Sequence, residues 1–176
     1  TFVEKKLNIT NCPTETVLHI DETDLKVKLD TNKKIIILGV GSSGPSTKWG
    51  IKNYTLLIKE LNKKNDYFFY LLCGPEENYI AQDIMDNIKE NNCMSLSKKN
   101  ISEIIPILSN SKIYIGNDSF GHHVTSQRGI PSFIIMLDTP KAYSDYSKNQ
   151  FRILPKNVNE NDITHDSAFS ADSITV

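Results

Sequence analysis

The chain has 176 residues, of which 39% are hydrophobic and 23% are charged, and its formal net charge is −1. This length fits one domain with a core large enough to fold without disulfides or metals. The balanced charge gives no basis for a nucleic-acid partner, and no apolar run approaches the roughly 20 residues that a membrane-spanning helix needs.

The cysteines carry no recognisable site. Cys12, Cys73 and Cys93 are widely spaced, and no Cys-x-x-Cys pair occurs. An odd number at these spacings matches neither a zinc site nor a secreted disulfide framework. We therefore expect reduced thiols in a cytoplasmic protein, with Cys73 as a small core residue at the end of an apolar run.

The first 32 residues are predicted to be a linker or inter-domain segment. Apolar and polar residues alternate over 18–20 and 25–29, which is typical of short exposed strands. The chain opens on Thr1 and a lysine-bearing stretch. We expect a piece of a longer protein, in which an N-terminal domain precedes this one.

From residue 33 to residue 176, apolar runs alternate with segments of helical periodicity. The expected strands are 34–40, 67–72, a short one near 93–94, 112–115 and 133–137. The expected helices are 51–62, one opened by Gly74-Pro75, one capped by Asn100 with Glu103, 124–128, and a last one that begins within 170–176. This alternation predicts an α/β, Rossmann-like parallel sheet with helices on both faces.

Three polar turns follow the predicted strands, at residues 39–48, 73–77 and 116–123. In a parallel sheet the carboxyl ends of the strands share one edge, where ligands bind. We therefore expect the three turns to form a single site.

The first turn is rich in glycine and hydroxyl groups. Residues 39–44 match the G-x-G-x-x-G spacing, but Pro45, Ser46 and Thr47 delay the helix, which disfavours NAD. Its N–H groups and the hydroxyls of Ser42 and Ser43 still suit a phosphate, although the loop could simply connect two elements.

Charged residues lie in the first two of these turns. Lys48, at the mouth of the first turn, can neutralise a phosphate oxygen, although most lysines are solvated surface residues. In the second turn, Glu76 and Glu77 begin a helix, where carboxylates are ordinary partners of the helix dipole. A carboxylate there could instead bind the hydroxyls of a ribose.

The third turn contains the residues most suggestive of an anion site. Asp118 or Ser119 can cap the following helix, whose first N–H groups then attract a phosphate; capping alone is the simpler interpretation. His122 and His123 are adjacent, so on a helix they diverge by about a quarter turn. With no acid or cysteine predicted nearby, we expect no metal site there.

Taken together, the turns resemble those of glycosyltransferase family 9, the heptosyltransferases of lipopolysaccharide core synthesis. The resemblance covers residues 34–140. It lies in Lys48-Trp49, in Gly74-Pro75-Glu76, in the capped helix at Asn100, and most specifically in Gly116-Asn117-Asp118-Ser119 with His123. The chain departs from the family at Phe120, where a glycine is usual and where Gly121 follows one place later, and at Gly50, where a proline is usual.

The resemblance implies the C-terminal, donor-binding domain of a GT-B glycosyltransferase and inverting transfer of a sugar from an ADP-heptose-like nucleotide donor. Lys48, Asp118 and His123 would be the catalytic residues. The donor would be bound by Ser42, Ser43, Glu76, Ser119 and Gly121, with no metal and no other cofactor.

The implied partners are a nucleotide-sugar donor, a lipopolysaccharide or other glycan acceptor, and an N-terminal domain that supplies the general base. The full-length protein would be cytoplasmic and could lie peripherally at the inner face of the cytoplasmic membrane. A nucleotide-sugar hydrolase or epimerase on the same fold remains an alternative, as does a non-catalytic nucleotide-binding domain.

Overall fold

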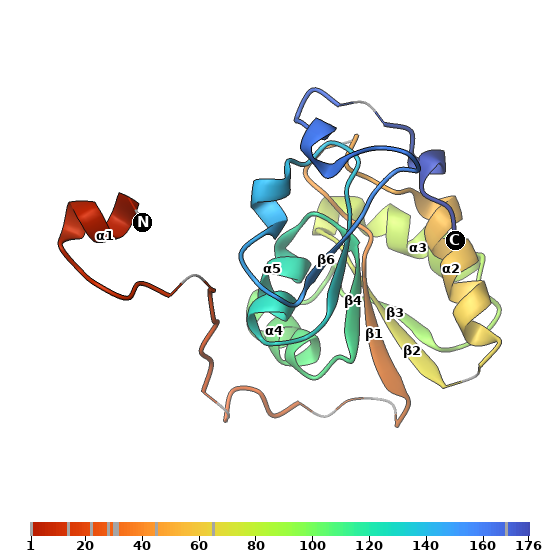
Figure 1. Ribbon diagram of the computed structural model, residues 1–176. Coiled ribbons are helices and arrows are strands. Elements are labelled where there is room, and N and C mark those ends of the chain that lie inside the picture. Colours follow the sequence, from red (N-terminus) through yellow and green to blue (C-terminus); the bar gives the residue numbers. More distant parts are fainter. Residues whose placement is uncertain are drawn as a thin grey trace.

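A computed structural model describes residues 2–13, 15–21, 23–27, 29, 32–44, 46–64, 66–167 and 169–176. Thr1, Lys28 and Pro45, which entered the predictions above, lie outside the described residues. The described chain forms one sheet flanked by helices, preceded by an extended N-terminal segment (Figure 1).

Six parallel strands make the sheet, in the order β3-β2-β1-β4-β5-β6. The strands are β1 (Lys34–Gly39), β2 (Tyr67–Leu72), β3 (Cys93–Ser95), β4 (Ile113–Asn117), β5 (Ser132–Ile135) and β6 (Gln150–Ile153). The helices are α1 (Phe2–Leu7), α2 (Ile51–Asn62), α3 (Asn78–Asp86), α4 (Ile101–Ser109) and α5 (Phe120–Gln127). This is the Rossmann-like α/β fold that the alternation of apolar runs predicts.

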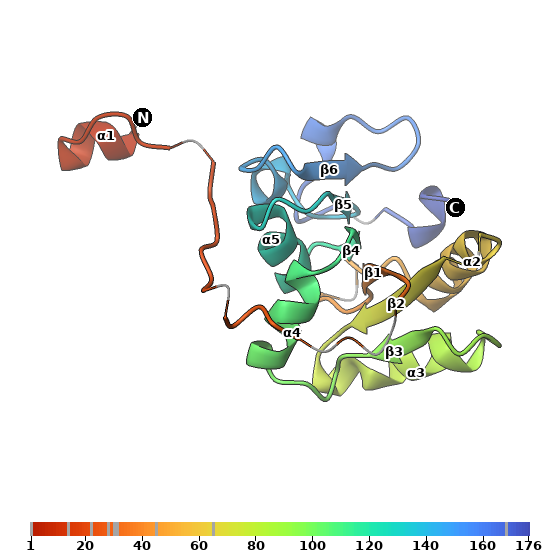
Figure 2. The same cartoon turned by 90° about the horizontal axis from the view of Figure 1, so that it is seen from below.

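Helices cover both faces of the sheet, with α2 and α3 on one side and α4 and α5 on the other (Figure 2). Alternate residues of the central strands therefore enter different cores. Ile36 and Leu38 pack with the α2 and α3 side, whereas Ile35 and Ile37 pack with the α4 and α5 side. Burial on both faces explains why these strands are continuous apolar runs.

Most predicted elements are confirmed, and the differences have local causes. Helix α5 begins at Phe120, four residues before the predicted start, because Ser119 is its N-cap and the His122 side chain accepts the Ser119 backbone N–H. Strand β6 was not predicted, since Gln150 and Arg152 interrupt its short apolar pattern.

The two ends of the chain also differ from the predictions. The N-terminal segment has a short helix, α1, none of whose residues is buried, and the described residues before β1 include no strand. His19, in this segment, is exposed. Near the C-terminus, the expected helix is a single 3-10 turn, η4 (Ala171–Ser173).

The strand order reverses between β1 and β4, whose carboxyl ends lie side by side. Gly39 pairs with Gly116, and a Cβ added at Gly116 would lie 2.6 Å from the Gly39 backbone. The two glycines therefore allow the strands to approach closely at their ends. A reversal of this kind opens a crevice beyond the strands, which is where open α/β sheets bind ligands. Among the described residues, no helix is long and apolar enough to cross a bilayer.

Candidate functional site

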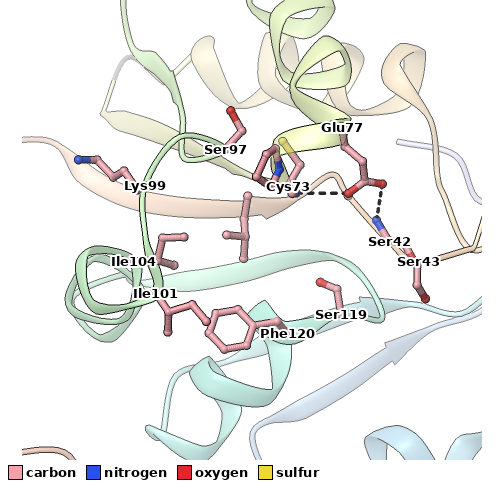
Figure 3. A pocket seen from close by; sticks show the side chains of 14 residues that line it. Ser42, Ser43, Cys73, Glu77, Ser97, Lys99, Ile101, Ile104, Ser119 and Phe120 are labelled. Carbon is pink, nitrogen blue, oxygen red and sulfur yellow. Dashed lines mark hydrogen bonds between the residues drawn. The ribbon is translucent and has the colours of Figure 1, made fainter.

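A cavity of about 330 Å³ lies beyond the carboxyl ends of β1, β2 and β4 (Figure 3). All three predicted turns contribute to its walls, together with the segment that enters α4. The lining residues used below are Ser42, Ser43, Glu77, Ser97, Lys99, Ile101, Ile104, Ser119 and Phe120. The parallel strands thus bring the three turns to one site, as their positions in the sequence predicted.

One end of the cavity is polar. Ser42 and Ser43 reach it from the loop after β1, and Ser119 reaches it from the N-cap of α5. The Ser119 hydroxyl lies 3.1 Å from the Tyr114 hydroxyl, which in turn donates to the Asn117 carbonyl at 2.8 Å. The first N–H groups of α5 have no intrahelical acceptor, so this end favours an anion.

Glu77 is the carboxylate of the cavity. Its Oε1 accepts the Ser42 backbone N–H at 3.1 Å and lies 2.8 Å from the Lys48 Nζ, while its Oε2 accepts the Gly74 N–H at 3.3 Å. Burial pushes the pKa of Glu77 upward, but these hydrogen bonds outweigh it and the pKa is lowered. Glu77 therefore stays ionised and holds the loop after β1 against the turn after β2.

The other end of the cavity is apolar. Ile101 and Ile104 of α4 form it together with Phe120, whose ring lies beside Ile101 (Figure 3). Phe120 is 43% exposed and Ile101 is 61% exposed, although both belong to this wall. Ser97 and Lys99 border the same end. A ligand that fits both ends would combine an anionic group with a flat or apolar one.

Asn117, at the end of β4, fixes the loop after β1 in place. Its Oδ1 accepts the Trp49 backbone N–H at 3.0 Å and the Tyr54 hydroxyl at 3.1 Å, and its Nδ2 donates to the Val40 carbonyl at 3.1 Å. The side chain is fully buried. Asn117 belongs to the motif that carries the family resemblance, but the sequence predicted no role for it. Its position at a strand end, directly before Asp118, was the available signal.

Trp49 and Cys73 are structural residues. Trp49 is buried in the core, where its Nε1 donates to the Ile174 carbonyl at 2.8 Å. Cys73 is buried beside the cavity, and burial, followed by the charge of Glu77, raises the pKa of its thiol to about 11. A thiol that remains protonated is a poor nucleophile, and the expectation that Cys73 is a small core residue is confirmed.

Asp118, His122 and His123 form a second polar group behind Ser119. The Asp118 Oδ1 lies 3.1 Å from the His122 Nδ1 and 3.7 Å from the His123 Nε2. The two imidazole rings lie 3.8 Å apart, centre to centre. The expectation that the adjacent histidines diverge with no acid nearby is wrong, because α5 begins early enough to bring Asp118 against its first turn.

Burial controls the protonation of this group. It raises the pKa of Asp118 to about 6, opposed by the Thr139 hydroxyl and reinforced by the charge of Asp138. Burial and the neighbouring His123 lower the pKa of His122 to about 3, and burial also lowers the pKa of His123. Both imidazoles are therefore neutral at pH 7, where Asp118 is mostly ionised.

The structure places the predicted site residues in three ways. Ser42, Ser43 and Ser119 line the cavity, whereas Lys48 lies outside the lining and pairs with Glu77, which belongs to it. Asp118 and His123 form the second polar group instead. Glu76 is exposed outside the lining, and Gly121 is buried on the face of α5 that packs against Leu72 and Tyr114, so the structure places neither in the cavity. The roles assigned to these residues stay predictions.

The comparison with protein families gives a match over most of the chain. The model of glycosyltransferase family 9 (heptosyltransferase) matches residues 1–160. A search of the curated proteins by sequence finds no match.

Solved structures match in fold. Heptosyltransferase II of E. coli, described as an ADP-heptose lps heptosyltransferase, is 16% identical with a TM-score of 0.69 over 89% of this chain and 51% of that chain. E. coli heptosyltransferase WaaC with ADP is 17% identical, with a TM-score of 0.73, and the match covers 94% of this chain and 50% of that chain. A family 9 glycosyl transferase from Veillonella parvula is 16% identical with a TM-score of 0.75 over 97% and 55%. The chain thus spans about half the length of these proteins.

Proposed function

This chain belongs to glycosyltransferase family 9, and from this membership we propose that it binds the nucleotide-sugar donor of a glycosyl transfer in the cavity at the β1–β4 crevice. The two-ended form of that cavity is the observation that carries the proposal. The diphosphate would lie at the end formed by Ser42, Ser43 and Ser119, and the base would lie against Ile101 and Phe120.

The residues at the polar end suit the departure of a nucleoside diphosphate. In an inverting transfer the acceptor attacks the anomeric carbon, and the bond to the diphosphate oxygen breaks with a gain of negative charge on that oxygen. The Lys48 ammonium and the N–H groups at the start of α5 are preorganised donors for this charge. We expect Glu77, rather than the predicted Glu76, to accept hydrogen bonds from the ribose, because Glu77 lines the cavity and also pairs with Lys48.

The finer features of the reaction follow from the family. We propose an ADP-heptose-like donor, since the matching WaaC structure was solved with ADP, and a lipopolysaccharide or other cell-surface glycan as acceptor. The general base would come from a second domain, so this chain alone would bind the nucleotide without transferring sugar. Sugar transfer by the purified chain would contradict the proposal that a second domain supplies the general base.

Calorimetric titration of the chain with ADP, UDP, GDP and NAD tests the proposal. We expect one nucleoside diphosphate to bind better than the others and better than NAD. Lys48→Ala should weaken it at least tenfold, because a charge-assisted hydrogen bond contributes about 1.5–3 kcal/mol. Lys52→Ala is the matched control, since that lysine is exposed on α2. Equal binding of NAD, or no nucleotide binding at all, would contradict the proposal.

A further inference from the structure

The N-terminal segment is attached to the domain at two places outside the cavity lining. The first is Leu18, whose backbone N–H donates to the Gln127 carbonyl at 3.1 Å and whose carbonyl accepts the Arg128 guanidinium at 3.1 Å. Gln127 and Arg128 form the C-terminal end of α5. Both backbone groups of Leu18 are therefore hydrogen-bonded to this helix end, as in an ordered segment rather than a free linker.

The second attachment is to the C-terminal end of α4. The Leu25 carbonyl accepts the Asn110 Nδ2 at 3.1 Å, and Asn110 is the C-cap of that helix. Val27 and Leu29 are partly buried against the apolar core on the α4 and α5 side of the sheet. Figure 2 shows the segment passing beside α4. We call the described residues 18–21, 23–27 and 29 the strap.

The two helices that the strap contacts also form the apolar end of the cavity. Ile101 and Ile104 lie at the start of α4, and Phe120 begins α5. The helices have nine and eight residues, and backbone hydrogen bonds link each turn to the next. A shift at the C-terminal end of either helix therefore moves its part of the cavity wall. The strap and a bound ligand would thus contact the same two helices at opposite ends.

The strap spans a hollow instead of filling it. A cavity of about 520 Å³ lies beneath it, and the apolar side chains that line this cavity include Val27, Leu29 and Ile107. Close-packed protein interiors have few voids of this size. Segments with few buried apolar contacts detach at a low free-energy cost. The strap contains no strand of the sheet, so its detachment leaves the pairing of the six strands unchanged.

We propose that the strap is a positioning element for the donor site. When docked, it holds α4 and α5 in the arrangement that forms the apolar end of the cavity, and its detachment releases both helices. The inference rests on the proposed binding of a nucleotide in that cavity. Two events that favour the same arrangement stabilise each other by equal factors. Nucleotide binding should therefore tighten the docking of the strap, and displacement of the strap should weaken nucleotide binding.

The test measures binding of ADP, UDP and GDP to the whole chain by calorimetry. Val27→Ser removes an apolar contact of the strap, and Val17→Ser is the matched control, because Val17 is 60% exposed. We expect Val27→Ser to weaken the preferred nucleotide at least about fivefold, the lower end of typical coupling between two sites. Val17→Ser should leave the affinity unchanged.

Amide hydrogen exchange, followed by mass spectrometry, separates positioning from a general loss of stability. In Val27→Ser, the amides of α4 should exchange faster, whereas those of α2 and α3 should not change, because these two helices cover the other face of the sheet. In the wild type, the preferred nucleotide should slow exchange in the peptide that contains Leu18, which does not line the cavity. Faster exchange in every helix of the variant would overturn the proposal and indicate a purely structural role.

Failure of this inference can be told apart from failure of the proposed function. Equal nucleotide affinity of the wild type and Val27→Ser would overturn the strap as a positioning element, while donor binding would stand. A wild type that binds none of the three nucleotides would contradict the proposed function and, with it, the coupling of the strap to the cavity.

Discussion

Single side chains of this domain hold its polar loops in place, and Glu77 is the clearest case. It joins the turn after β2 to the loop after β1 through Ser42 and Lys48. A sequence can show a carboxylate near a strand end, but it cannot show which of two adjacent ones points inward. Glu76 and Glu77 differ by one position in a 3-10 turn, η1 (Pro75–Glu77), and only Glu77 faces the cavity.

Glu77→Gln should therefore make stability depend less on pH. The native pKa of Glu77 is lowered, so its contribution is present above the unfolded pKa of about 4.3 and is lost as the pH falls through the native pKa. We expect the variant to be less stable by about 1–2 kcal/mol at pH 7, with the gap closing below about pH 4. Urea unfolding of the wild type and the variant at pH 7 and at pH 3.5 measures this difference in the free energy of unfolding.

Glu76→Gln is the matched control, because the Glu76 side chain is exposed. It should change the free energy of unfolding by less than about 0.5 kcal/mol. A loss for Glu77→Gln that is the same at pH 7 and at pH 3.5 would show that its carboxylate charge does not stabilise the fold.

Asn117→Ala should destabilise the fold more than Glu77→Gln does. The Asn117 amide is buried, and both its oxygen and its nitrogen are hydrogen-bonded. The change leaves the buried Trp49 N–H and Val40 carbonyl without their partner. We expect a loss of about 2–4 kcal/mol in the free energy of unfolding, measured in urea. Asn161→Ala, at an exposed position, should be neutral. A loss below about 1 kcal/mol for Asn117→Ala would remove it as the residue that holds the loop.

At the scale of elements, Gly121 allows helix α5 to pack closely against the sheet. A Cβ added there would lie 2.5 Å from both the Leu72 Cδ2 and the Tyr114 Cε2. Alanine favours a helix interior over glycine by about 0.5–1 kcal/mol, but overpacking costs about 1–3 kcal/mol. We expect Gly121→Ala to lower the free energy of unfolding by about 1–2 kcal/mol, because the clash outweighs the propensity.

Thermal unfolding of Gly121→Ala, with Gly44→Ala as the control, measures the net effect of the clash and the gain in helix propensity. The nearest atoms to a Cβ at Gly44 belong to Thr47 at 3.5 Å, which is an ordinary contact, so that variant should stay within about 0.5 kcal/mol of the wild type. A Gly121→Ala variant more stable than the wild type would mean that α5 can shift away from the sheet without cost.

Elements with a strong internal pattern could be predicted from the sequence, and those defined by their neighbours could not. The apolar periodicity of 51–62 and the capping box at Asn100 are local signals, and α2 and α4 follow them. The early start of α5 depends on a contact between His122 and Ser119 that competes with a later cap. Strand β6 depends on pairing with β5, since its own residues are only partly apolar.

At the scale of the whole molecule, the parallel sheet places the three polar turns at one edge. The sequence indicated that three turns share one edge because parallel strands all end on the same side. It could not show that the turns divide into two groups, with Ser42, Ser43 and Ser119 at the cavity and Asp118 with the histidines behind it. The second group also involves the chain after β5, which places Tyr146 against His123 and Asp138 near Asp118.

A crystal structure of this chain with the nucleoside diphosphate it prefers would show whether the donor binds at the β1–β4 crevice. We expect the diphosphate within hydrogen-bond distance of Ser119 and of the loop at Ser42, near Lys48, with the base between Ile101 and Phe120. A nucleotide bound away from the β1–β4 crevice, or with its base at the serine end and its phosphates against Ile101, would contradict it.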